Sequence, residues 1–228
     1  MKDIIIYGAG GFGREVAALL KRINAIVPTW NLLGFIDDNR QRYPIGHKNE
    51  YGRILGDAEF LNKYDQPINV ILALGKPTAL SIVRSKLNNP NICFPNIIGP
   101  EAKILDEDNF NMGQGNIISS YATMSCNVKL GDFNIFNNRC SVGHDAQIGN
   151  FNTFMTATRI SGDTLIGEKN FFGVGSILLQ GMKVGNNTTI AAGAVVMRNT
   201  KDRPVTPSNT KTHMNAPFTA GAFLTGSG

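Results

Sequence analysis

A six-residue repeat of large apolar side chains runs through the second half of this chain and restricts what it can fold into. Every sixth residue from position 112 to position 196 is apolar, at fifteen successive positions. These positions are Met112, Ile118, Met124, Leu130, Phe136, Val142, Ile148, Phe154, Ile160, Ile166, Phe172, Leu178, Val184, Ile190 and Val196. A period of six fits neither an α-helix nor a free strand. It fits short strands joined by regular corners, with three strands, and so three repeats, in each coil of a solenoid.

The residues between the apolar positions favour corners. A residue that tolerates a tight turn often follows directly, as at Gly113, Gly131, Asn137, Gly143, Gly149, Gly167, Gly173 and Gly185, and we expect positive φ angles there. Five such coils at roughly 4.8 Å per strand make a prism about 24 Å long. An earlier series, Ile98, Ile104 and Phe110, is two residues out of frame. It predicts an irregular first coil with a loop over residues 106–111.

The first part of the chain, residues 1–97, has the alternation of an α/β domain. An apolar run over residues 2–7 leads into a glycine-rich turn, Gly8-Ala9-Gly10-Gly11-Phe12-Gly13, and a helical pattern follows over residues 14–23. Strands over 32–36 and 69–74 and a helix over 77–87 complete a small, Rossmann-like parallel sheet. Such a glycine turn lets the backbone approach a phosphate, whose charge the helix N-terminus attracts.

The ends of these strands predict a nucleotide site. Its expected members are Gly8, Gly10, Gly11, Gly13, Asp37, Asp38 and Gly75. Asp37 or Asp38 would accept hydrogen bonds from a ribose or a base. A glycine turn with only a structural role and a dinucleotide site of dehydrogenase type are the alternatives. The domain has about half the length of a full dinucleotide fold, so a mononucleotide fits better.

Charge and cysteine content exclude several function classes. The net charge is +5, from 22 Lys and Arg against 17 Asp and Glu, without the long basic block typical of nucleic-acid binders. The apolar runs are far shorter than the ~20 residues of a membrane span, and the first residues do not read as a signal peptide. Three cysteines, at 93, 126 and 140, cannot all pair. We expect a cytoplasmic protein without disulfides or a metal site.

Both halves together resemble one known group. The glycine turn with Gly34-Phe35-Ile36-Asp37-Asp38, followed by hexapeptide repeats containing Val142-Gly143-His144-Asp145, is similar to the bacterial sugar acetyltransferases of surface-polysaccharide biosynthesis. The resemblance covers about residues 2–200. It implies an α/β Rossmann-like domain over residues 1–97, then a left-handed parallel β-helix over residues 98–203. Residues 204–228 do not match the family and read as an irregular tail.

The resemblance also implies an activity and its partners. The family transfers acetyl groups from acetyl-CoA to nucleotide-linked 4-amino-4,6-dideoxy sugars, or to hydroxyls of sialic acid. Its members form homotrimers with active sites between neighbouring prisms. For this chain it implies that the first domain holds the nucleotide of the sugar and that the β-helix holds acetyl-CoA.

His144 is the candidate general base, because imidazole can accept a proton near neutral pH and because the family motif matches here. Of the other histidines, His47 lies in a polar loop and His213 in the tail. By resemblance, Asp145 orients the imidazole and Asn137 contacts the acceptor. Gly162, one coil after His144, offers an N–H to the thioester oxygen. A solvated carboxylate and plain corner residues are the alternative readings of Asp145, Asn137 and Gly162.

Some positions depart from the family pattern. Thr153 stands where the family has a second histidine near the acyl donor, and Phe12 and Gly99 replace two further histidines. Thr153, Gly162, Gly173 and Arg198 are the expected acetyl-CoA contacts. Arg198, Lys201 and Arg203 could meet CoA phosphates or form a solvated cluster. Cys126 and Cys140 lack a base partner in sequence, which favours direct transfer; the departures leave open a β-helical scaffold that binds a nucleotide sugar without catalysis.

Overall fold

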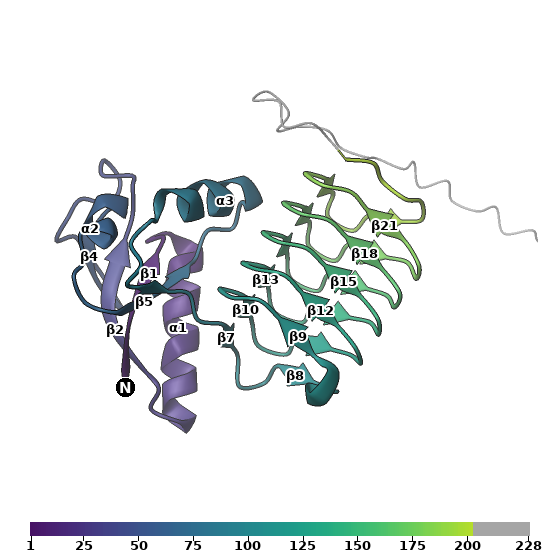
Figure 1. Ribbon diagram of the computed structural model, residues 1–228, viewed down its shortest axis with the longest axis horizontal. Coiled ribbons are helices and arrows are strands. Elements are labelled where there is room, and N and C mark those ends of the chain that lie inside the picture. Colours follow the sequence, from purple (N-terminus) through teal and green to yellow (C-terminus); the bar gives the residue numbers. More distant parts are fainter. Residues whose placement is uncertain (203–228) are drawn as a thin grey trace, which may run out of the picture.

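The computed structural model describes residues 1–202. The expected tail, with Arg203 and His213, lies outside the described residues. Figure 1 shows an α/β domain beside a stack of coils, with α1 and α3 on the side of the sheet that faces the coils. No helix among residues 1–202 combines the length and the apolarity needed to cross a membrane.

The first domain is a six-stranded sheet with the order β3-β4-β2-β1-β5-β6. Its elements are β1 (Lys2–Tyr7), α1 (Gly11–Ile26), β2 (Trp30–Ile36), β3 (Lys48–Asn49), β4 (Gly52–Gly56), α2 (Ala58–Asn62), β5 (Ile68–Leu72), α3 (Pro77–Lys86) and β6 (Ile92–Cys93). The predicted strands and helices are confirmed with shifted ends. The sequence analysis missed β3, β4, α2 and β6, because they are short and carry little periodic signal.

The second domain is a left-handed parallel β-helix of two-residue strands, arranged on three faces. Face 1 contains β7 (Ile97–Ile98), β10 (Ile117–Ile118), β13 (Ile135–Phe136), β16 (Thr153–Phe154), β19 (Phe171–Phe172) and β22 (Thr189–Ile190). Face 2 contains β8 (Lys103–Ile104), β11 (Thr123–Met124), β14 (Ser141–Val142), β17 (Arg159–Ile160), β20 (Ile177–Leu178) and β23 (Val195–Val196). Face 3 contains β9 (Asn111–Met112), β12 (Lys129–Leu130), β15 (Gln147–Ile148), β18 (Leu165–Ile166) and β21 (Lys183–Val184).

The six-residue repeat produces the expected inner column. Each strand pairs with the strand three repeats further along the chain, as Phe136 does with Phe154, and every repeat position from Ile118 to Val196 is buried. The rings of Phe136, Phe154 and Phe172 stack with centroids 4.6 and 4.7 Å apart. The corners between the faces are called edge 1–2, edge 2–3 and edge 3–1 below.

Edge 3–1 is held by a buried ladder of amides. Asn116, Asn134, Asn152 and Asn170 are fully buried. The side-chain oxygen of each accepts the backbone N–H of the residue one coil further on, at 2.7 to 3.0 Å. Buried backbone donors at this edge are satisfied in this way, so the coils stack in a single register.

The expected positive φ angles occur at a different position of the repeat. Every sixth residue from 115 to 193 has a φ angle between 53° and 72°, three positions after an apolar residue rather than one. The predicted glycines have a different role, because successive coils approach closely there. A Cβ on Gly149, for example, would lie 2.8 Å from the carbonyl oxygen of Gly167.

The first coil is irregular, as predicted. Asn111 pairs with Lys129 at the regular spacing of three repeats, whereas Ile97 pairs with Ile117, which is two positions further away than a regular coil would place it. The short 3-10 helix η1 (Glu107–Asn109) lies in the segment that holds this insertion. The loop over residues 106–111 therefore absorbs the frame shift.

The first domain covers the lower part of face 1. Its hydrophobic core continues into Ile117, Phe133 and Ile135 of the β-helix. At edge 3–1 the guanidinium of Arg84, on α3, lies 5.8 Å from the ring centroid of Phe133. At edge 1–2, Arg22 of α1 forms an ion pair with Glu101. The contacts of the first domain with the β-helix thus lie along face 1 and its two edges.

Candidate active site

His144 lies on edge 2–3, directly after β14. Its column, which takes one residue from each successive coil, contains Cys126, His144, Gly162, Gln180 and Arg198. The His144 side chain is 53% exposed, so the imidazole is neither packed inside the column nor covered by the first domain. An exposed imidazole on a rigid β-helix edge is available to react with a bound molecule.

The Asp145 carboxylate holds the His144 ring. His144 Nδ1 and Asp145 Oδ2 are 2.8 Å apart. Adjacent side chains of a strand point apart, but Asp145 has a φ angle of 59°, and this left-handed turn lets the two side chains meet. The sequence analysis expected a corner at Gly143; the corner residue is Asp145 itself.

A third side chain completes this arrangement. Asn127 Nδ2, from the coil below, donates to Asp145 Oδ1 at 2.7 Å. Hydrogen bonds from His144 and then from Asn127 hold the pKa of the Asp145 carboxyl below its ordinary value. The ionised carboxylate accepts the Nδ1–H of a neutral imidazole, which leaves Nε2 as the basic nitrogen. Asn127 was missed, although counting one coil back from Asp145 would have found it.

Gly162 lies one coil above His144, as the period predicted. The Nε2 end of the imidazole faces it so closely that a Cβ on Gly162 would lie 2.5 Å from Nε2. Asp163 N donates to the His144 carbonyl oxygen at 2.8 Å, which ties the two corners together. Within residues 1–202, the Gly162 N–H has no hydrogen-bond acceptor.

Asn137 and Gly173 lie at another edge. Both are on edge 1–2, two coils apart, and Asn137 Nδ2 contacts Met155 Sδ at 3.4 Å. In a single chain they are therefore separated from His144 by the width of face 2. One chain alone does not bring the predicted catalytic residues together.

The expected acetyl-CoA residues divide into two groups. Gly162 and the exposed Arg198 share the edge of His144. Thr153 is fully buried on face 1, and its hydroxyl has no hydrogen-bond partner among residues 1–202. The first domain covers this part of the face, so the structure does not present Thr153 to a cofactor, contrary to expectation. The predicted contact of Arg203 lies outside the described residues.

The glycine turn combines two packing glycines with two open ones. Gly8 has a φ angle of 112°, and a Cβ there would lie 2.5 Å from the Ala73 carbonyl oxygen; a Cβ on Gly13 would collide with the backbone of Gly8. Gly10 precedes α1 and Gly11 begins it, and the space beside Gly11 is open. No side chain caps this helix start, which leaves its first N–H groups available to an anion.

Gly75, predicted as part of the nucleotide site, follows β5 and is exposed with open space around its Cα. Another group over the turn was missed by the sequence analysis: a Cβ on Gly10 would lie 3.6 Å from the Tyr43 hydroxyl. The backbone of the turn, Gly75 and Tyr43 therefore form the accessible surface at this sheet edge.

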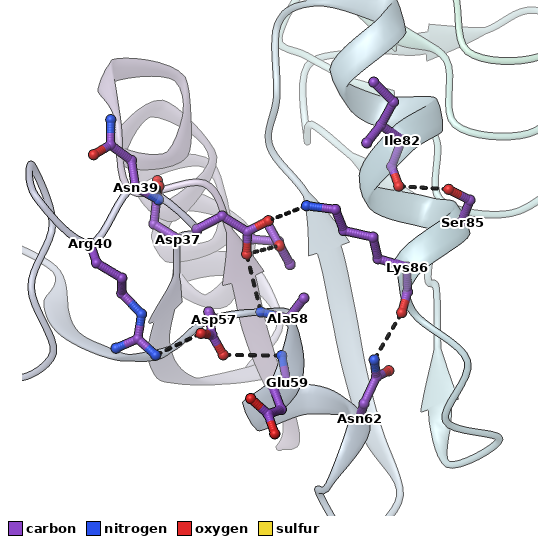
Figure 2. A network of polar contacts seen from close by, with 12 residues as sticks. Asp37, Asn39, Arg40, Asp57, Ala58, Glu59, Asn62, Ile82, Ser85 and Lys86 are labelled. Atoms are coloured by element: carbon purple, nitrogen blue, oxygen red, sulfur yellow. Dashed lines mark hydrogen bonds and ion pairs between the residues drawn. The ribbon is translucent and has the colours of Figure 1, made fainter.

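Asp37 and Asp38 are engaged in contacts within the domain. Asp37 accepts the Ala9 N–H and the Asn39 N–H, both at 2.9 Å, so it closes the glycine turn. Asp38 accepts the Tyr7 hydroxyl at 2.5 Å and the Lys86 ammonium at 2.7 Å. Figure 2 shows Lys86 reaching from the end of α3 to this sheet edge. Both carboxylates stabilise the edge from which a ligand would be bound.

These contacts change the acidity of two groups. Burial raises the pKa of the Asp38 carboxyl, but hydrogen bonds from Lys86, Tyr7 and the Ala58 N–H outweigh it, and the pKa is lowered. Burial, and then the hydrogen bond to Asp38, raise the pKa of the Tyr7 hydroxyl. Asp38 is therefore ionised and Tyr7 neutral at physiological pH.

A groove of about 210 Å³ lies between α1 and edge 1–2 of the β-helix. Phe12, at the start of α1, and Asn138, next to Asn137, both line it. The glycine turn of a chain therefore lies near its own edge 1–2, whereas His144 lies on edge 2–3. Among residues 1–202, no cluster of three or more His, Cys, Asp or Glu side chains could hold a metal ion.

Comparison with known proteins gives one family match and several structural matches. Residues 3–87 match the model of the PglD N-terminal domain family. No curated protein sequence matches significantly. The acetyltransferase domain of PglB from Neisseria gonorrhoeae FA1090, in complex with acetyl coenzyme A, has a TM-score of 0.78 and 26% identity, over 88% of this chain and 93% of that chain.

Two further structures share the fold. WeeI from Acinetobacter baumannii AYE has a TM-score of 0.77 and 24% identity, over 89% of this chain and 94% of that chain. PerB from Caulobacter crescentus, in complex with CoA and GDP-perosamine, has a TM-score of 0.75 and 21% identity, over 89% of this chain and 92% of that chain. Residues 3–87 thus form a PglD N-terminal domain, and the chain as a whole is similar to the acetyltransferase domain of PglB.

Proposed function

We propose that this protein is an acetyl-CoA-dependent acetyltransferase that acetylates the amino group of a nucleotide-linked amino-deoxy sugar. The observation that carries the proposal is the His144–Asp145 pair, 2.8 Å apart, exposed on a β-helix edge beside a glycine. The PglB domain that this chain resembles binds acetyl coenzyme A. PerB, which has the same fold, binds GDP-perosamine.

In the proposed reaction the acceptor amine attacks the carbonyl carbon of the acetyl thioester. The N–C bond forms and the C–S bond breaks. His144 Nε2 takes the proton from the amine and passes it to the leaving CoA thiolate, so that an amide and free CoA thiol result. The Gly162 N–H is the proposed donor to the oxyanion, an interaction that can contribute ~3 kcal/mol in the transition state.

The proposed path of acetyl-CoA follows edge 2–3. Arg198 lies three coils beyond His144 in the same column. At the usual strand spacing this is about 14 Å, which a pantetheine arm can span, and a guanidinium suits a phosphate group. Gln180 lies between Gly162 and Arg198 in this column. Asn137 and Gly173, on edge 1–2, stay candidates for contacts with the acceptor and with acetyl-CoA bound to a neighbouring copy.

A homotrimer with active sites between prisms follows from this proposal. The glycine turn of a chain lies near its own edge 1–2, whereas its His144 lies on edge 2–3. If edge 2–3 of one copy meets edge 1–2 of the next, the base reaches a sugar held by the neighbouring glycine turn. Because acetyl-CoA and nucleotide sugars are molecules of the cytoplasm, we propose that the protein acts there.

Incubation of the full chain with acetyl-CoA and a panel of nucleotide sugars tests the function. The panel pairs UDP-, GDP- and dTDP-linked 4-amino-4,6-dideoxy sugars with the same sugars carrying a hydroxyl in place of the amine. We expect release of free thiol only with one or more amino sugars. Release only with the hydroxyl sugars would identify an O-acetyltransferase.

Calorimetry separates the enzyme from a scaffold. An acetyltransferase binds acetyl-CoA saturably, in competition with CoA. Binding of a nucleotide sugar without any binding of acetyl-CoA would contradict the proposed function and favour a β-helical scaffold.

A further inference from the structure

We propose that Asn127 is a positioning residue of this site: its amide fixes the Asp145 carboxylate and thereby sets the tautomer and orientation of the His144 imidazole. The role in catalysis rests on the proposed function, because it needs His144 to be the base. The effect on the imidazole itself does not, and it can be measured without any substrate.

The contacts form a continuous chain from one coil to the next. Asn127 Nδ2 donates to Asp145 Oδ1 at 2.7 Å, and Asp145 Oδ2 lies 2.8 Å from His144 Nδ1. The backbone joins the same two coils, since Asp145 N donates to the Cys126 carbonyl oxygen at 3.0 Å. Each carboxylate oxygen thus has its own partner, and the carboxylate plane is fixed relative to the ring.

The exposure of the pair makes this support important. The side chains of His144 and Asp145 are 53% and 51% exposed. An exposed carboxylate with one partner samples several rotamers, and its salt bridge to an exposed partner is weak. A second, charge-assisted hydrogen bond from a rigid coil restricts that sampling. Asn127 therefore supplies the order that burial gives to a catalytic carboxylate elsewhere.

The corner backbone alone does not require asparagine at this position. Asn127 has a φ angle of 53°, and the equivalent corner positions carry Tyr121, Arg139 and Ala157 with similar φ angles. Side chains of very different chemistry are thus accepted at such corners. The amide of Asn127 is explained by its contact with Asp145 rather than by the turn.

The charge around the imidazole is simple. Asp145 is on the same coil, the Cys126 thiol and the neutral Asn127 amide are on the coil below, and Asp163 is on the coil above. Within residues 1–202, Asp145 is the only charged partner in an ion pair with His144. A second carboxylate in place of the Asn127 amide would repel Asp145 and stabilise the imidazolium.

The test is an NMR titration of the imidazole in the full chain without substrate. His144→Gln assigns the signal among the three histidines. In Asn127→Asp we expect the titration midpoint of His144 to rise by about half a pH unit. In Asn127→Gly, which keeps a residue suited to the left-handed turn, we expect the midpoint to fall. The ¹⁵N shifts of the neutral ring should also change from a single Nδ1–H tautomer to a mixture.

Turnover adds a second readout. Asn127→Gly should lower kcat by about three- to tenfold with an unchanged KM for acetyl-CoA, and the acidic limb of the pH profile should follow the NMR midpoint. Asn187→Gly is the matched control, since Asn187 is a corner asparagine on edge 3–1 with a φ angle of 56°. It should leave the midpoint, the tautomer and kcat unchanged.

The two ways of failing are distinct. Midpoints and tautomer shifts that match those of the unaltered protein in both Asn127 variants would overturn the positioning role, whatever the activity. A changed tautomer in an Asn127 variant, together with full turnover in a His144→Ala variant, would support the positioning role and overturn His144 as the base.

Discussion

The Nε2 end of the His144 imidazole lies against Gly162, one coil above, with no room for a methyl group between them. The period of three repeats per coil brings the two positions together, and the absence of a side chain at Gly162 leaves the ring beside a free backbone N–H. The candidate base and the candidate oxyanion donor thus come from adjacent corners of one rigid stack.

Gly162→Ala should damage catalysis far more than folding. The added Cβ would lie 2.5 Å from Nε2, so the imidazole must turn away, and a displacement of about 1 Å at a reacting group can cost a hundredfold in rate. The φ angle of Gly162 is not in the left-handed region, so the backbone accepts alanine there. We expect kcat to fall about a hundredfold, with a small change in Tm by calorimetry. Unchanged kcat would argue against the assigned geometry.

Cys126→Ala should retain turnover. The sequence analysis gave this thiol no base partner, but Cys126 is exposed and lies one coil below His144. A thiol nucleophile would form an acetyl-enzyme, whereas direct transfer needs no thiol. The matched control is Cys93→Ala, also exposed but in the first domain. Loss of turnover in Cys126→Ala alone, with an acetylated protein detected by mass spectrometry, would favour a covalent route.

Cys140 is a separate case. Burial raises the pKa of this thiol to about 12, and its Sγ donates to the Met155 carbonyl oxygen at 3.2 Å. It is therefore a neutral, packed side chain at physiological pH. We expect thiol-labelling reagents to react with Cys93 and Cys126 in the native protein and with Cys140 only after unfolding.

Arg198→Ala should weaken acetyl-CoA binding without changing the chemical step. Removal of a phosphate-binding guanidinium costs on the order of 1.5–3 kcal/mol, so we expect KM for acetyl-CoA to rise tenfold or more at nearly constant kcat. Lys183→Ala, an exposed cation on face 3, is the control. Equal KM values for the two variants would remove Arg198 from the proposed site.

Asp38→Asn should destabilise the protein in a pH-dependent way. The pKa of Asp38 is lowered in the folded state, so its ionised form contributes stability above the unfolded value of about 3.9. That contribution is lost as the pH falls through the folded-state pKa. We expect the Tm deficit of Asp38→Asn to be largest near pH 7 and to disappear at the lowest pH values. Asp108→Asn, at an exposed position, should show no such deficit, and a pH-independent deficit in Asp38→Asn would contradict the charge-based account.

The sequence predicted the fold well because the repeat is long and strictly periodic. The inner column, the coil of three repeats, the loop in the first coil and the position of Gly162 relative to His144 all follow from counting. The location of the positive φ angles did not follow, because glycine has two uses: it permits a left-handed turn, and it lets two backbones approach. Here the close approach of coils determines residues such as Gly149, while residues such as Asp145 and Phe133 adopt the left-handed turn.

The site was predicted in part, for the same kind of reason. His144, Asp145 and Gly162 are related by sequence neighbourhood or by the period, so they could be found. Burial of Thr153 depends on the first domain covering face 1, which no local pattern reports. The engagement of Asp38 with Tyr7 and Lys86 depends on how three distant segments meet at a sheet edge. Asn127 was within reach of the period but was not sought.

The most direct measurement is the turnover of His144→Ala with acetyl-CoA and the amino sugar identified by the panel. The account predicts that kcat falls by ~100-fold or more while calorimetry gives an unchanged affinity for the nucleotide sugar, and that His47→Ala, in an exposed loop of the first domain, keeps full turnover. Near-normal turnover in His144→Ala would contradict the account.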